Sequence, residues 1–170
     1  IKGDLITAPL ADQAGAMIEL CKKYPELDAQ RIGIFGWSFG GYFACHATMQ
    51  RPDVFKAGCA GGSVADWRDY DTHYTERYMG MPQERAEAYD KTSVLTYAKD
   101  LRVPLLLIHG TSDDNVYFFH TLKIADALFR AGKKYELLPL AGFTHSVYEP
   151  EAVKAMWSRI VGFFQENLGK

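Results

Sequence analysis

The chain has 170 residues and a net charge of −2 at pH 7, and 48% of its residues are hydrophobic. This length is enough for one domain that buries roughly 70% of its unfolded surface. The charge gives no reason to expect nucleic acid or an anionic membrane as a partner, and no apolar run reaches the ~20 residues that a membrane-spanning helix requires. Cys21, Cys45 and Cys59 lie far apart without a C-x-x-C pair, which argues against a disulfide framework or a zinc site and leaves the compartment undecided.

The first predicted element is a helix over residues 12–24. Apolar residues recur at helical spacing from Ala14 to Cys21, and Pro25 ends the helix, whereas the first ten residues carry no strong pattern. The chain does not begin with Met and shows no signal peptide. Ile1 is therefore expected to be an interior position of a longer protein, or the start of a mature or cloned fragment.

The most informative stretch is Arg31–Gly41, which reads RIGIFGWSFGG. Its first part suits a buried strand, GWSFG fits the pattern G-x-S-x-G, and a helix follows. Strand, sharp turn and helix form the context in which this pattern presents a nucleophilic serine. We expect a strained backbone at Ser38, which Gly36 and Gly40 accommodate, and a close approach of helix to strand at Gly41. The helix N-terminus then points at whatever binds the serine.

Beyond this turn the chain alternates strands with helices. The predicted elements are a strand at 54–60, a polar and aromatic segment at 63–102, a strand at 103–108, a helix at 118–131, a strand at 134–138 and a final helix opened by Pro150. This alternation predicts an α/β fold with a mostly parallel sheet and helices on both faces. About four strands are visible, so the Arg31 strand, which is central in such folds, would lie near an edge. The fold is expected to be incomplete at its N-terminus.

A serine hydroxyl needs a base to take its proton, and the base needs an anion that fixes its tautomer. In this architecture the acid and the histidine follow the serine in that order, on loops at the C-terminal ends of later strands. Asp113 and Asp114 follow one predicted strand, and His145 follows the next. We therefore predict Ser38 as the nucleophile, Asp113 in preference to Asp114 as the acid, and His145 as the base.

The four remaining histidines are weaker candidates. His46 lies inside the helix after Ser38, where a packing role is favoured, and His120 belongs to a later helix. His109 ends a strand and is expected to brace the loop of the acid. His73 lies among tyrosines and could touch a substrate. No histidine and carboxylate pair has metal-ligand spacing on a helix, so neither a metal nor a cofactor is expected.

With these residues assembled, the chain resembles the C-terminal catalytic part of the prolyl oligopeptidase family of serine peptidases, and within it the dipeptidyl peptidase IV-like branch. The matching segments, in order, are GWSFGG, WRDYD with YTERYMG, LLIHGTSDDNV, and finally His145. The resemblance covers most of the chain, and YTERYMG is highly specific to that branch. It implies that residues 1–170 are the C-terminal portion of an α/β-hydrolase peptidase domain. The first strands of that domain and a β-propeller would then lie upstream.

The resemblance also implies roles for individual residues. The Phe39 backbone N–H would be one donor to the oxyanion, and Asn115 would hydrogen-bond a substrate carbonyl. An apolar pocket for a proline-sized residue would be walled by four side chains: Trp67, Tyr70, Tyr74 and Val116. Tyrosines offer flat apolar walls with polar tips, which suits a pyrrolidine ring. Trp67, Tyr70, Tyr74 and Tyr78 are spaced like one face of a helix, a pattern that without the resemblance would be read as core.

Two departures from the family pattern matter. His145 is followed by Ser146, where the family usually has glycine. The upstream regions would also supply a second oxyanion donor, a tyrosine hydroxyl, and the acidic residues that bind a substrate amino terminus. Because the loss of one oxyanion donor costs roughly 10²–10³ in rate, residues 1–170 alone are expected to have weak or no peptidase activity.

Three kinds of function stay open. The first is a serine peptidase that removes Xaa-Pro or Xaa-Ala dipeptides from peptide substrates. The second is an acylaminoacyl peptidase, oligopeptidase or esterase of the same fold, since fold does not fix substrate. The third is an association module without activity, because an uncovered strand invites pairing with a second copy of the chain and makes a homodimer possible. The resemblance slightly favours a periplasmic or extracellular location.

Overall fold

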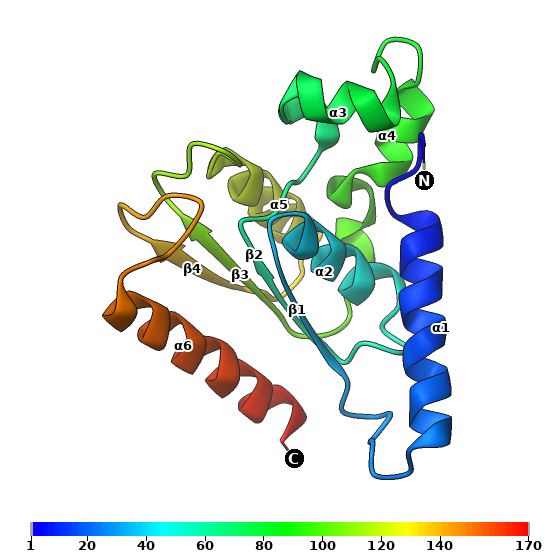
Figure 1. The fold of residues 1–170 in the computed structure, drawn as a ribbon, viewed down its shortest axis with the longest axis vertical. Helices are drawn as coiled ribbons and strands as arrows, with labels where there is room; N and C mark the ends of the chain where they lie inside the picture. The colour runs from blue at the N-terminus through cyan, green and yellow to red at the C-terminus, as the bar shows by residue number, and fades with distance from the viewer. Residues whose placement is uncertain (1, 170) are drawn as a thin grey trace.

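The computed structural model describes residues 2–169 as a four-stranded sheet packed between helices (Figure 1). The strands are β1 (Gly33–Trp37), β2 (Ala57–Gly61), β3 (Leu105–Gly110) and β4 (Glu136–Leu140). The α-helices are α1 (Thr7–Lys23), α2 (Phe39–Gln50), α3 (Thr72–Met79), α4 (Ala86–Thr92), α5 (Phe119–Arg130) and α6 (Pro150–Leu168), and two 3₁₀ segments are η1 (Trp67–Asp69) and η2 (Val94–Asp100).

All neighbouring strands are parallel, in the order β1-β2-β3-β4. Alternate residues of β3 face opposite sides of the sheet. Leu105 and Leu107 join the larger core with α1, α2 and α5, whereas Leu106 and Ile108 pack under α6. Figure 1 shows α6 alone on one face of the sheet and α1, α2 and α5 on the other. The predicted parallel α/β sheet with helices on both faces is therefore confirmed.

The first helix begins earlier than predicted, at Thr7. A side-chain oxygen of Asp4 accepts hydrogen bonds from the backbone N–H groups of Ile6 (3.1 Å) and Thr7 (2.9 Å) and so supplies partners for the helix start. The other oxygen of Asp4 accepts from Lys91 (2.8 Å). Pro9 fits because the first turn of a helix needs no N–H donor. Hydrophobic periodicity did not predict this start, because residues before 12 have no long apolar repeat and the partner of the first N–H groups is a single aspartate three positions before the helix.

Two strand boundaries also shift. The predicted strand at 54–60 starts only at Ala57, because Val54 and Phe55 both donate their backbone N–H groups to Arg51 in a turn. Those two side chains are buried, which explains the strand-like pattern. The predicted strand at 134–138 lies two residues further on, at Glu136–Leu140, and its Pro139 is tolerated because β4 ends the sheet of the described residues.

The aromatic segment does not form one continuous helix, contrary to the spacing of its rings. Asp66 accepts a hydrogen bond from the Arg68 N–H and starts η1, and Asp71 accepts from the Tyr74 N–H and starts α3. Two side-chain caps close together force a break between the two pieces. The rings nevertheless form one cluster, in which each contacts another at centroid distances of 5.1–5.7 Å.

Within residues 2–169, β1 pairs only with β2 and forms an edge of the sheet, as the sequence predicted. Phe35 on this strand is 36% exposed and contacts Trp157 of α6 at a ring-centroid distance of 5.0 Å. That a second copy of the chain covers this edge stays a prediction. In the described part of the chain, no helix has the length and apolar character that crossing a bilayer requires.

The three cysteines are all free. Cys45 and Cys59 are buried, and burial raises the pKa of each thiol to about 12, so both are inert hydrophobic side chains. Cys21 is only partly buried.

Candidate active site

Ser38 sits in the sharp turn between β1 and α2 with φ 59° and ψ −119°. It is the one non-glycine residue with positive φ in the described residues, a conformation that costs energy and persists only where surrounding contacts enforce it. Its backbone N–H donates to the Gly61 carbonyl at the end of β2 (2.8 Å). The predicted strained serine turn is thus present, at the carboxyl ends of the strands.

Close backbone packing holds this turn. A Cβ on Gly36 would overlap the backbone of Gly40, and a Cβ on Gly41 would overlap the Gly61 carbonyl. Glycine is therefore required at 36 and 41 by lack of space. Gly40 differs from the expectation, because a Cβ there would meet nothing within 4 Å.

Asp113 lies in the loop after β3 and is buried, whereas Asp114 is exposed. One carboxylate oxygen of Asp113 accepts the backbone N–H groups of Asn115 (3.0 Å) and Val116 (2.9 Å). The other oxygen contacts Nδ1 of His145 at 2.7 Å. Of the two adjacent aspartates, only Asp113 contacts the predicted base.

His145 lies in the loop between β4 and α6, and two contacts fix its place near the serine turn. Its carbonyl accepts a hydrogen bond from Nε1 of Trp37 (2.8 Å), the residue before Ser38. Gly62 has φ +52°, and a Cβ there would lie 3.2 Å from both Cε1 of His145 and Nε1 of Trp37. Gly61 therefore bonds Ser38, and the next residue, Gly62, lies against the imidazole of His145.

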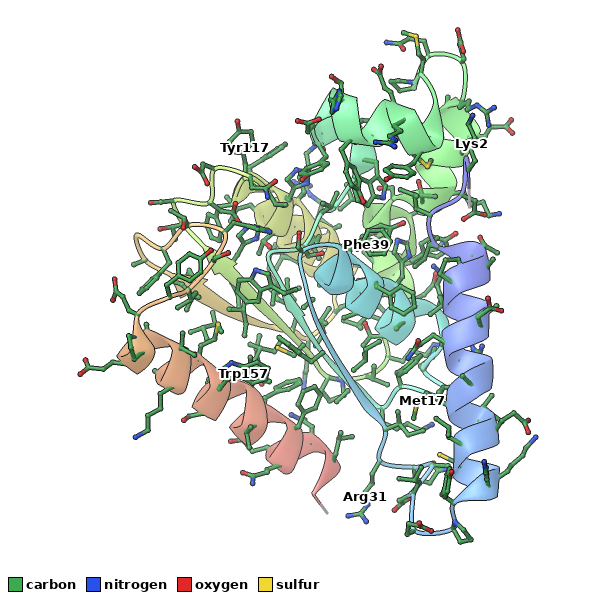
Figure 2. The ribbon with its side chains drawn as sticks, in the orientation of Figure 1. Lys2, Met17, Arg31, Phe39, Tyr117 and Trp157 are labelled. Atoms are coloured by element: carbon green, nitrogen blue, oxygen red, sulfur yellow. The ribbon has the colours of Figure 1, made fainter. Side chains whose placement is uncertain are left out.

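These contacts bring the loops of Ser38, Asp113 and His145 together at one edge of the sheet. Within residues 2–169 no hydrogen bond joins the Ser38 hydroxyl to the imidazole. Such contacts are often long without substrate and tighten in the complex. In Figure 2, Phe39 marks this edge at the end of α2 nearest α3. As the first residue of that helix, Phe39 has a backbone N–H without a partner inside the helix.

Sequence reasoning missed Trp37 and Gly62. Trp37 occupies the second position of the G-x-S-x-G pattern, which any residue can fill, so the pattern gave no sign of a role for its indole. No role was predicted for Gly62, which lies just after the strand predicted at 54–60. Its Gly-Gly context was the available signal for a close approach.

The other histidines are structural or exposed. His46 is fully buried, with Nε2 3.1 Å from the Thr92 carbonyl and Nδ1 2.7 Å from Nε2 of Gln50, and burial lowers its pKa to about 4. His109 contacts Asp113 and Val116, so the expected brace of the acid loop is confirmed. His120 lies in α5, as predicted, and His73 is exposed on α3.

The predicted pocket residues separate into two layers. Trp67 and Val116 are 1% and 0% exposed and lie behind the surface. Tyr74 is 36% exposed, stacks on Trp67 and meets Tyr70 edge-to-face at a centroid distance of 5.5 Å. The Tyr70 hydroxyl donates to Oδ1 of Asn115 (2.7 Å), which leaves the Asn115 amide N–H groups free to donate elsewhere.

Burial raises the pKa of both Tyr70 and Tyr74, so both hydroxyls stay protonated near neutral pH. The surface layer thus presents two aromatic rings beside the Asn115 amide donor, and the Tyr70 hydroxyl proton is already bonded to Asn115. In residues 2–169 no group of three or more His, Cys, Asp or Glu side chains is arranged to hold a metal ion.

The parallel sheet and the serine held in a strained strand–turn–helix place this chain in the α/β-hydrolase fold. The model of the Prolyl oligopeptidase family matches residues 1–170. The chain belongs to the prolyl oligopeptidase family, and the predicted fold class and family are confirmed.

Similar proteins include dipeptidyl peptidase 8 from Homo sapiens and from Mus musculus, each 41% identical over 161 residues. These matches cover 93% of this chain but 18% of each relative. The crystal structure of Porphyromonas gingivalis dipeptidyl peptidase 4 superposes with a TM-score of 0.93 and 36% identity, over 98% of this chain and 24% of that one. The chain therefore spans less than a quarter of the length of these relatives.

Proposed function

We propose that this chain forms the catalytic part of a serine peptidase in which Ser38 is the nucleophile, His145 the general base and Asp113 the acid. The observation that carries the proposal is the 2.7 Å contact between Asp113 and Nδ1 of His145, beside the strained turn of Ser38. The carboxylate accepts a hydrogen bond from Nδ1–H, which keeps the proton of the neutral ring on Nδ1 and leaves Nε2 free to accept the proton of the serine. This tautomer is the one that a general base requires.

The reaction follows from these roles. Ser38 Oγ attacks the scissile carbonyl while His145 Nε2 takes the hydroxyl proton, and the same proton passes to the leaving amine as the peptide bond breaks. Water, deprotonated by His145, then releases the acyl group and regenerates Ser38. The Phe39 N–H at the start of α2 stabilises the oxyanion of each tetrahedral intermediate, aided by the positive end of the helix.

We propose cleavage after proline or alanine, with removal of a dipeptide. The edge-to-face rings of Tyr70 and Tyr74 suit a pyrrolidine ring, and Trp67 with Val116 backs them. Asn115, oriented by the Tyr70 hydroxyl, donates to a substrate carbonyl. The names of the similar proteins, which are dipeptidyl peptidases, support this choice over an acylaminoacyl peptidase, an oligopeptidase or an esterase.

The test is turnover of a Gly-Pro chromogenic substrate by the complete gene product. Ser38→Ala and His145→Ala should each lower kcat/KM by at least about 10³-fold. The first variant lacks the nucleophile, and the second lacks the base that takes the proton of the nucleophile. Ser158→Ala, which removes an exposed hydroxyl on α6, should leave kcat/KM unchanged. Parent-like turnover by Ser38→Ala would contradict the proposal. Faster cleavage of an acylated amino acid or a short ester than of Gly-Pro would refute the substrate assignment alone.

A further inference from the structure

The carboxylate of Asp113 has a second imidazole partner, His109, which the serine mechanism does not use. His109 lies in β3 and is fully buried. Its Nε2 is 3.0 Å from Oδ2 of Asp113, the oxygen that also contacts His145, and 2.7 Å from the Val116 carbonyl. A histidine of β3 and a histidine of the loop between β4 and α6 therefore share one carboxylate oxygen.

The neighbours of His109 assign its tautomer. Both partners of Nε2 are acceptors, a carboxylate oxygen and a carbonyl, so Nε2 must carry a proton. Nδ1 is 2.7 Å from Oγ1 of Thr121, a buried hydroxyl on α5 that can donate to an unprotonated nitrogen. Burial lowers the pKa of His109, which favours this neutral ring. The neutral Nε2–H form satisfies every polar atom of the ring.

We infer that His109 is a positioning residue, whose Nε2–H holds Oδ2 of Asp113 in place for His145 and at the same time fastens the loop that carries Asn115. This inference rests on the function proposed above. Four N–H groups then converge on the carboxylate, from Asn115 and Val116 on one oxygen and from the two imidazoles on the other. Such a set compensates the burial of the carboxylate and leaves it one orientation.

The second contact of Nε2 extends this role to substrate binding. By bonding the Val116 carbonyl, His109 closes the loop that runs from β3 through Asp113 and Asn115. Asn115 in turn accepts from the Tyr70 hydroxyl. One buried imidazole thus supports the acid on one side and the predicted substrate-carbonyl donor on the other.

The test compares His109→Leu with His109→Gln in the complete gene product. Leucine fills similar space without a donor, whereas the glutamine amide can place an N–H near the former Nε2. We expect His109→Leu to lower kcat for the Gly-Pro substrate about tenfold, and His109→Gln to recover most of that loss. His120→Leu is the matched control and should retain the parent kcat, because it removes another buried imidazole whose hydrogen bond is with the Ala65 N–H and not with Asp113. Equal kcat for both His109 variants, whether parent-like or equally reduced, would overturn the inference.

A second measurement does not depend on activity. In ¹⁵N spectra of histidine-labelled protein, with His109→Gln used to assign the signal, His109 should be the neutral Nε2–H tautomer at pH 7. An Nδ1–H tautomer would overturn the inference. This test holds even if His109→Leu fails to fold. Failure of the proposed function would give a different result. Ser38→Ala would retain turnover, and the tautomer of His109 would be unchanged.

Discussion

Tyr74 is the residue on which the substrate assignment depends most. It is the exposed member of the aromatic cluster, braced by Trp67 behind it and by Tyr70 beside it. Because its ring is a wall and carries no reacting atom, its loss should weaken binding of the proline ring and spare the chemistry itself. A residue that only filled the core would instead lower all activities together.

Tyr74→Ala should therefore lower kcat/KM for the Gly-Pro substrate about tenfold, the value of one lost aromatic contact, and that for a short ester by less than about threefold. Steady-state kinetics with both substrates measure the difference. Tyr24→Ala removes a tyrosine of similar exposure at the end of α1 and serves as the control. Equal losses for the two substrates would discredit the pocket assignment.

At the scale of elements, His46 joins α2 to α4. Its Nε2 donates to the carbonyl of Thr92, the last residue of α4, which also accepts from the Tyr42 hydroxyl. The helix that follows Ser38 is thereby fastened to the segment that carries the aromatic cluster. This connection requires a neutral, fully buried imidazole, so it makes stability depend on pH.

Burial lowers the pKa of His46 from 6.5 to about 4. Between these values the unfolded chain binds more protons than the folded one, so the contribution is complete above pH 6.5 and is lost as the pH falls toward 4. The free energy of unfolding should fall by about 2–3 kcal/mol through this residue. Denaturant titrations at pH 7.5 and 4.5 should show a smaller decrease for His46→Gln than for the parent. His73→Gln, on the exposed face of α3, is the control, and identical decreases in parent and His46→Gln would contradict the assignment.

At the scale of the whole molecule, the sequence was most informative where a feature of the fold depends on a local pattern of residue types. The G-x-S-x-G turn, the order of Ser38, Asp113 and His145, and the alternation of strands with helices were all predictable from local patterns. The start of α1 was not, because a single capping aspartate outside the periodic segment determines it. The break in the aromatic segment was likewise hidden by rings that meet in space although they do not share a helix.

The contacts that assemble the candidate site were the least predictable part. Trp37 holds the His145 carbonyl, and Gly62 leaves room for the imidazole, yet both depend on loops more than 80 residues apart meeting at one edge. No local sequence pattern predicts a contact between such distant loops. The shared oxygen of Asp113 is the same kind of feature, because His109 approaches it from β3 and His145 from the loop between β4 and α6.

The central claim is that Ser38 is a nucleophile activated by His145. A fluorophosphonate probe reports this directly, because it phosphonylates only an activated hydroxyl, and peptide mapping by mass spectrometry locates the adduct. We predict a single adduct on the peptide that contains Ser38, and its absence in His145→Ala. An adduct at another residue, or labelling of His145→Ala at the parent rate, would contradict the account.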